Sequence, residues 1–151
     1  PNAPVDLAPA DTGAFVNDHI VRLLAGVTQS ERPLFLQMAY NGAAAMDELV
    51  THDPSLVVGI LGGSAGTTRD TFELLSQAEQ HGARVALFGR KVQRAESQLD
   101  LLAAMRAVLR RQVSPEQAVV AYHEVLRSKG IAPTRSLAED QEITEPVLAQ
   151  G

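Results

Sequence analysis

The residues best suited to chemistry lie in two glycine-containing loops. The first loop is Gly62-Gly63-Ser64-Ala65-Gly66, and Thr67 and Thr68 add hydroxyl groups directly after it. Glycine lets a backbone approach a ligand closely, and the free N–H groups and positive dipole end of the following helix suit a phosphate. The loop has neither the lysine of a Walker A sequence nor the spacing of a dinucleotide fingerprint. On its own, it is interpreted equally well as a phosphate-binding loop and as a tight strand–helix turn.

The second loop is Gly89-Arg90-Lys91, which follows the next apolar run. In a parallel sheet the ends of neighbouring strands lie side by side, so this loop can complete an anion site with the first one. Arg90 would bind a phosphate and Gly89 would offer its N–H group. The alternative is a solvated pair of charges. The segment 84–111 holds seven basic and two acidic side chains, so we expect local positive potential in either case.

Gln37 and Tyr40 stand at the end of the first predicted strand. A buried amide needs hydrogen-bond partners, so Gln37 is either a satisfied polar group of the core or a site residue. Tyr40 is expected to pack. The four histidines have no metal-ligand spacing, so the sequence predicts neither a metal site nor a cofactor.

Helices and strands that alternate along the chain must position these loops. Short apolar runs predict strands at Leu34–Tyr40, Leu56–Leu61 and Ala83–Phe88. Three- and four-residue periodicity predicts helices at about 12–26, 43–51, 68–80, 96–111 and 115–128. This order is typical of an α/β fold with a parallel sheet, and strands apolar on both faces predict helices covering both faces.

Local signals add detail at the helix ends. Ser114-Pro115 with Gln117 predicts a capped helix start, and Gly130 predicts a stop. Either Thr68 or Asp70, with Glu73, caps the helix after the first loop. The last sixteen residues contain four acids and no base, and we expect this tail to wrap a neighbour or stay mobile. The buried side of the 96–111 helix is predicted to consist of Leu99, Leu102, Met105, Ala107 and Leu109.

Composition narrows the class of protein. The chain has 151 residues, 45% of them hydrophobic and 21% charged, which predicts one globular domain. A net charge of −5 argues against nucleic-acid binding. No apolar run is long enough for a bilayer, and no signal peptide is evident. The absence of cysteine excludes disulfide and thiol chemistry and fits a cytoplasmic protein.

One segment resembles a known family. LVVGILGGSAGTTRDTFELLSQAEQHGARVALFGRKVQ is similar to the last two strand–loop–helix units of the class I aldolase family, the archaeal-type fructose-bisphosphate and deoxyribose-phosphate aldolases, which are (β/α)8 TIM barrels. The resemblance covers roughly residues 33–109. In that family the loops after the seventh and eighth strands hold the substrate phosphate. The resemblance therefore implies that Gly62, Gly63, Ser64, Gly89 and Arg90 bind phosphate.

Two departures from the family stand out. The family forms a Schiff base with a lysine on its sixth strand, but the corresponding run Leu34–Tyr40 has Gln37 near that position and no lysine. An amide cannot form an iminium, so Schiff-base catalysis through this position would be lost. The catalytic residues are therefore not identified by the sequence. The candidates are Gln37, by its position, and Lys91, the one lysine near the proposed site, which is expected to offer charge. A full barrel needs about 250 residues. The chain is therefore interpreted as a single domain or barrel fragment, with phosphate-site units over 33–112 and a helical extension and acidic tail over 113–151.

These observations predict an aldolase-like protein that binds a small phosphorylated sugar or keto compound, with carbon–carbon bond lyase activity. The alternative is a non-catalytic phosphate-ligand-binding or assembly protein that lacks the Schiff-base lysine. A sheet of few strands leaves exposed edges. We therefore expect a homo-oligomer, or association with the missing part of the barrel, and no nucleic-acid or membrane partner.

Overall fold

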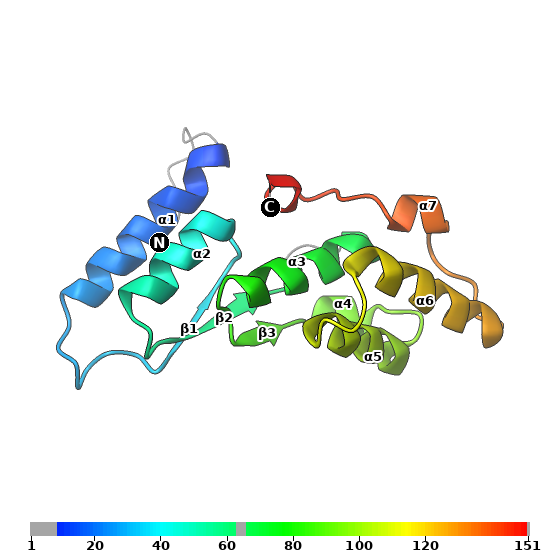
Figure 1. Cartoon of the computed structure of the whole chain (residues 1–151), viewed down its shortest axis with the longest axis horizontal. Coiled ribbons are helices and arrows are strands. Elements are labelled where there is room, and N and C mark those ends of the chain that lie inside the picture. The colour runs from blue at the N-terminus through cyan, green and yellow to red at the C-terminus, as the bar shows by residue number, and fades with distance from the viewer. Residues whose placement is uncertain (1–8, 63–65, 151) are drawn as a thin grey trace.

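The computed structural model describes residues 9–62 and 66–150. Three parallel strands, β1 (Phe35–Met38), β2 (Val57–Leu61) and β3 (Val85–Leu87), form a sheet in the order β1-β2-β3 (Figure 1). Met38 pairs with Ile60, which in turn pairs with Ala86. The predicted α/β class with a parallel sheet is confirmed, although each strand is shorter than its apolar run.

Helices alternate with the strands up to β3 and then follow one another. They are α1 (Pro9–Ala25), α2 (Ala43–His52), α3 (Thr68–Gln80), α4 (Arg90–Gln93), α5 (Gln98–Leu109), α6 (Pro115–Ser128) and α7 (Leu137–Asp140), with a 3-10 turn at Leu148–Gln150. The bounds of α3 are those predicted from the sequence. The short helix α4 was predicted as a loop, and that prediction is wrong.

Capping residues define where α3 and α6 begin. The Thr67 hydroxyl accepts a hydrogen bond from the Asp70 N–H at 3.0 Å, and the Asp70 carboxylate accepts one from the Thr67 N–H at 3.0 Å. This reciprocal pair is a capping box, so Thr67 is the cap and not Thr68 or Asp70 as predicted. The predicted capping box of Ser114 and Gln117 at α6 is confirmed.

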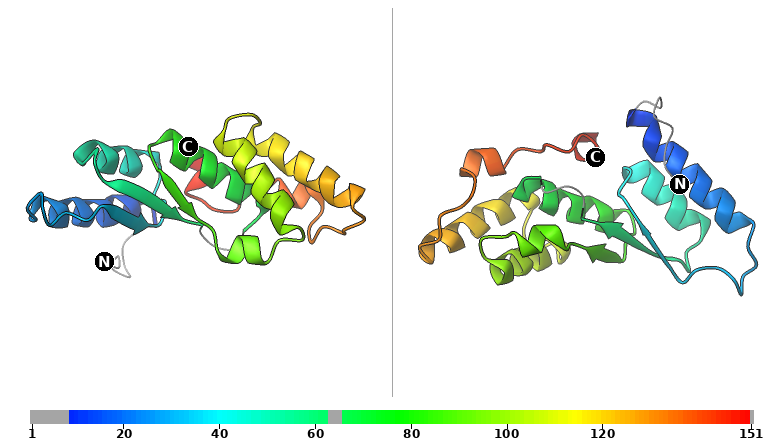
Figure 2. Two further views of the ribbon diagram at one scale, coloured as in Figure 1. Left: turned by 90° about the horizontal axis from the view of Figure 1, so that it is seen from below. Right: turned by 180° about the vertical axis from the view of Figure 1, so that it is seen from behind.

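One face of the sheet is covered by α1, α2 and α3 (Figures 1 and 2). Alternate strand residues point to this face, because successive side chains in a strand point to opposite sides. The core there is aliphatic and consists of Ile20, Leu24, Met38, Met46, Leu49, Val58, Ile60, Leu74 and Ala78, with Tyr40, Leu56 and Leu148 at its margins. This layer fixes the strands that carry the loops.

A second core joins α3 to α5 and α6. It contains Phe72, Leu75, Leu101, Met105, Val108, Ala118, Val119, Tyr122 and Leu126. The predicted buried side of α5 is wrong except at Met105, since Leu99 is 80% exposed. Helix α5 has apolar residues on two sides. The side that carries Leu101, Met105 and Val108 is buried, because α3 and α6 pack against it.

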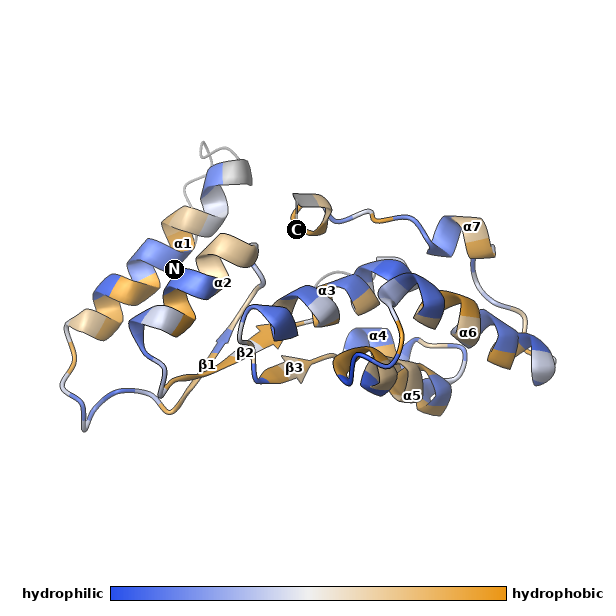
Figure 3. Ribbon diagram, in the orientation of Figure 1, coloured by the Kyte–Doolittle hydropathy of each residue, from blue (hydrophilic) through white to orange (hydrophobic). Residues whose placement is uncertain are grey.

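The opposite face of the sheet is open in the described part of the chain. Phe35 and Leu61 are each 41% exposed, and Leu87 is 37% exposed. Figure 3 nevertheless colours β2 as hydrophobic along its length. The prediction that helices cover both faces is therefore wrong for these residues. The sequence pattern was that of a doubly covered strand, but α5 packs against α3 and α6 instead of beneath the sheet.

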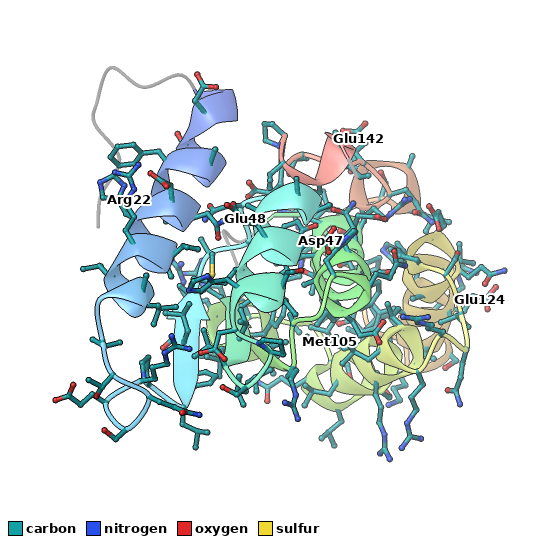
Figure 4. The ribbon with its side chains drawn as sticks, turned by 60° about the vertical axis from the view of Figure 1, so that its left-hand side comes forward. Arg22, Asp47, Glu48, Met105, Glu124 and Glu142 are labelled. Atoms are coloured by element: carbon teal, nitrogen blue, oxygen red, sulfur yellow. The ribbon has the colours of Figure 1, made fainter. Side chains whose placement is uncertain are left out.

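The acidic tail folds back over α3. The Thr67 hydroxyl donates a hydrogen bond to the Glu142 carbonyl at 2.6 Å, and the Gln77 amide donates one to the Leu148 carbonyl at 2.9 Å. Glu142 lies on this returning segment in Figure 4. Leu148 is buried in the sheet core. The expectation that the tail wraps a neighbour or stays mobile is wrong.

No helix in the described ranges combines the length and apolarity needed to cross a bilayer.

Candidate functional site

A pocket of about 510 Å³ lies at the carboxyl ends of the three strands. Its walls come from the segments that follow β1, β2 and β3, from α3 and from the returned tail. The lining residues are Ala39, Tyr40, Leu61, Gly62, Leu74, Leu87, Phe88, Gly89, Arg90, Lys91, Glu145, Val147 and Leu148. Gly62 of the first glycine-containing loop therefore meets the second loop at one cavity, as the order of the loops along the sequence predicted.

Strand pairing brings the two loops together. Leu61 and Leu87 are register partners at the ends of β2 and β3. Gly62, the first residue after β2, continues this pairing, because its N–H donates a hydrogen bond to the Leu87 carbonyl at 3.0 Å. Gly63 and Ser64, which were also predicted to bind phosphate, lie outside the described residues.

The two glycines of these loops have different surroundings. A Cβ atom at Gly62 would lie 2.5 Å from the Phe88 ring, so Gly62 is required for packing. A Cβ atom at Gly89 would meet nothing within 4 Å. The backbone of Gly89, at φ −80° and ψ −70°, suits any residue. Packing and backbone conformation therefore give no reason for glycine at position 89.

Arg90 is exposed at the pocket and begins α4. Within the described residues its side chain makes no hydrogen bond or ion pair, so its guanidinium donors are available to a ligand. Lys91 is half-buried and donates a hydrogen bond to the Gly66 carbonyl at 3.0 Å. Burial, assisted by nearby Arg135, lowers the pKa of Lys91, because removing an ammonium from water disfavours its charged form.

The amino terminus of α3 already holds a carboxylate of its own chain. The Thr68 N–H donates a hydrogen bond to Asp140 Oδ1 at 2.7 Å. The second oxygen, Oδ2, lies 2.9 Å from His123 Nε2, and both side chains are buried. The expectation that these helix N–H groups are free for phosphate is wrong for Thr68. Asp140 was not predicted as its partner, because the only signal for Asp140 in the sequence was its place in the acidic tail.

Tyr40 lines the pocket and is buried, as its predicted packing role requires. Its hydroxyl donates a hydrogen bond to Gln77 Oε1 at 3.3 Å. Burial, with the negative charges of Asp47 and Glu73, raises the pKa of Tyr40 to about 12. Tyr40 therefore offers the pocket a neutral phenol at physiological pH.

Gln37 is exposed, so the expectation of a buried amide is wrong. It pairs with Gly59 and shares the open face of the sheet with Phe35 and Leu61, which explains its exposure within an apolar run. It does not line the pocket. The structure therefore brings Gly62, Gly89, Arg90 and Lys91 together and leaves Gln37 outside.

Over residues 9–62 and 66–150, no three side chains of the metal-binding types lie close enough to share an ion. No protein-family model matches the chain, and no curated protein matches it.

Proposed function

We propose that the chain binds a small phosphorylated sugar or keto compound in the pocket at the strand ends. The phosphate contacts Arg90 and the Gly89 backbone, and the Gly62 loop forms the adjacent wall. The observation that carries the proposal is the presence in one pocket of an arginine whose side chain has no partner among the described residues and, next to it, a glycine that packing does not require. A guanidinium and an approachable backbone are the groups with which proteins hold phosphate.

The remaining walls fit the carbon skeleton of such a ligand. Leu61, Leu74, Phe88 and Leu148 are apolar, whereas Tyr40 supplies a hydroxyl. Phosphate sites of TIM barrels are built from the loops after the last two strands. We therefore relate β1, β2 and β3 to the last three strands of such a barrel. The open sheet face would be covered by the rest of the barrel or by another copy of the chain, which makes association part of the proposal.

Lyase chemistry would require an amine that attacks the carbonyl carbon of the ligand, forming an iminium with release of water. Lys91 is the lysine that lines the pocket, and its lowered pKa raises the fraction of free amine. Its ammonium, however, is bonded to the Gly66 carbonyl. The second candidate function is therefore ligand binding without turnover, which is favoured by the glutamine at position 37.

Calorimetric titration with dihydroxyacetone phosphate tests the binding proposal. Loss of one charge-assisted contact in Arg90→Gln should weaken affinity about tenfold or more. Arg84→Gln is the matched control, because Arg84 is also exposed and immediately precedes β3, at the end remote from the pocket. Equal affinities for the wild type and Arg90→Gln would remove Arg90 from the site, and no binding by the wild type would reject the proposal.

Borohydride trapping separates the two candidate functions. The protein is incubated with dihydroxyacetone phosphate, reduced, and examined by intact mass and peptide mapping. An adduct at Lys91 that disappears in Lys91→Met supports lyase chemistry. Binding without any adduct supports the non-catalytic alternative.

A further inference from the structure

A second pocket, of about 250 Å³, lies between the start of α3, helix α4 and the linker that precedes α7. Lys91 lines both pockets, but the other polar residues here take no part in the proposed function. They are Thr68, Arg94, Glu96, Tyr122, Thr134 and Arg135. Four separate parts of the chain therefore contribute polar residues to one small space.

Of the charged residues that line this second pocket, three are basic and one is acidic. Lys91 and Arg94 come from α4 and its carboxyl-terminal cap, and Arg135 comes from the linker between α6 and α7. Glu96 is the carboxylate in the pocket wall. The Thr134 N–H donates a hydrogen bond to Glu96 Oε1 at 2.8 Å, and the Tyr122 hydroxyl donates one to Oε2 at 3.2 Å. Each carboxylate oxygen of Glu96 thus accepts a hydrogen bond from one of these two donors. Neither oxygen contacts a cation of the pocket.

These hydrogen bonds also keep Glu96 ionised. Burial alone would raise its pKa, but the bonds from Thr134 and Tyr122 outweigh burial and lower the pKa to about 2. The carboxylate is therefore a fixed part of the wall.

The side chains of Lys91, Arg94 and Arg135 have more hydrogen-bond donors than the surrounding described residues have acceptors for them. The side chain of Arg94 makes no hydrogen bond or ion pair with any described residue. Arg135 lies 3.9 Å from Asp140, whose oxygens already contact the Thr68 N–H and His123. Lys91 bonds to the neutral Gly66 carbonyl. Burial is the main cause that lowers the pKa of Lys91. Nearby Arg135 adds to this effect, whereas the negative charges of Asp140, Glu96 and Asp70 oppose it. Neighbouring cations with unused donors define the recognition chemistry of an oxyanion.

We infer that this second pocket binds a small oxyanion of phosphate size through Arg94, Arg135 and Lys91. The ion bridges α4 to the linker that carries Thr134 and Arg135. That linker leads into α7 and the tail that lines the first pocket, so an ion bound here strengthens the attachment of the tail. The inference does not depend on the proposed function, because the phosphate of that ligand lies at Gly89 and Arg90.

The test follows the side-chain Nε–Hε resonances of arginine by NMR during titration with inorganic phosphate. The protein is the Arg90→Gln variant, in which the first pocket has lost its guanidinium. Sodium chloride at matched ionic strength is the control titration, and exposed Arg106 on α5 is the control resonance. The inference predicts that Arg94 and Arg135 shift along one saturating curve that chloride does not reproduce, whereas Arg106 stays unchanged.

Two further variants complete the test. Arg94→Gln should weaken the binding reported by Arg135 about tenfold, and Arg135→Gln should do the same for the binding reported by Arg94. The inference is overturned if neither arginine shifts, if only one does, or if chloride gives the same curve. Because Arg90 is absent throughout, a failed result here leaves the proposed function of the first pocket intact.

Discussion

The loops after β2 and β3 both carry a glycine at the same edge of the sheet. Only at the loop after β2 do other parts of the protein fill the space and bind the polar groups. At Gly62 the missing Cβ makes room for the Phe88 ring, and the helix that follows receives the Asp140 carboxylate at its amino terminus. At Gly89 there is open space, and Arg90 lacks a partner among the described residues. The difference shows that a glycine-containing loop is best judged by what surrounds it after folding.

Contacts at the start of α3, after the β2 loop, explain the path of the tail. Asp70 completes the capping box of α3 and also accepts hydrogen bonds from the Thr144 and Glu145 N–H groups, at 2.8 and 3.2 Å. Asp140 is held by His123 and by the Thr68 N–H. The tail residues that line the first pocket are therefore attached to the same helix end that the sequence indicated as a phosphate site.

Removing the Asp140 carboxylate, which binds the start of α3, should lower the stability of the protein more than any other change considered for the β2 loop. Asp140→Ala leaves His123 buried without its partner and the Thr68 N–H without an acceptor. We expect a loss of about 3 kcal/mol in the free energy of unfolding. Urea unfolding measures it. Glu124→Ala is the control, because Glu124 is exposed and points away from α6 in Figure 4. Equal midpoints for the two variants would contradict the assigned role of Asp140.

Gly62→Ala should have the next largest effect. The new methyl group would lie 2.5 Å from the Phe88 ring, so the ring or β2 must move. We expect a cost of about 1–3 kcal/mol in the free energy of unfolding, measured by thermal or urea unfolding. A variant as stable as the wild type would show that Gly62, like Gly89, is not needed for packing.

Acid should weaken the tail's attachment through Asp70. Burial would raise the pKa of Asp70, but hydrogen bonds from Thr144, Thr67 and Glu145 outweigh burial and lower it. A group with a lowered pKa stabilises the fold above its unfolded pKa, and that stability is lost as pH falls through the folded pKa. Stability should therefore fall below about pH 4.

Asp70→Asn should be less stable than the wild type at neutral pH, because it removes the charge from these bonds. It should also lose stability less steeply in acid. Thermal unfolding across the acid range measures both quantities. Parallel pH profiles for the variant and the wild type would contradict a contribution of Asp70 to the acid sensitivity.

Gly89→Ala should have the smallest effect on stability. Its helical backbone angles and the open space around it accept a methyl group. We expect the free energy of unfolding to stay unchanged or to rise by up to about 1 kcal/mol, since alanine restricts the unfolded chain. Thermal unfolding beside Gly62→Ala gives the comparison directly, and a large loss at position 89 would contradict the difference between the loops.

The sequence predicted the alternation of helices and strands as far as β3, the two long helices after it and the meeting of the two loops, because hydrophobic runs and parallel strands determine them. It did not predict the short helices α4 and α7. It predicted the α6 start from Ser114-Pro115 and the bounds of α3. It did not predict the contacts of Asp140 with His123 and α3, because these depend on the tertiary path of the tail. The exposure of Gln37 could not be predicted from the sequence either. An apolar strand has the same sequence pattern whether helices cover one face of its sheet or both.

Whether the Gly89–Arg90 loop is a ligand surface is decided by the affinity of Gly89→Ala for dihydroxyacetone phosphate. We expect a variant that is as stable as the wild type and binds about tenfold more weakly or worse, because a methyl group would stand where the ligand approaches the backbone. Unchanged affinity, or a wild type that does not bind the compound, would show that the loop does not hold this ligand.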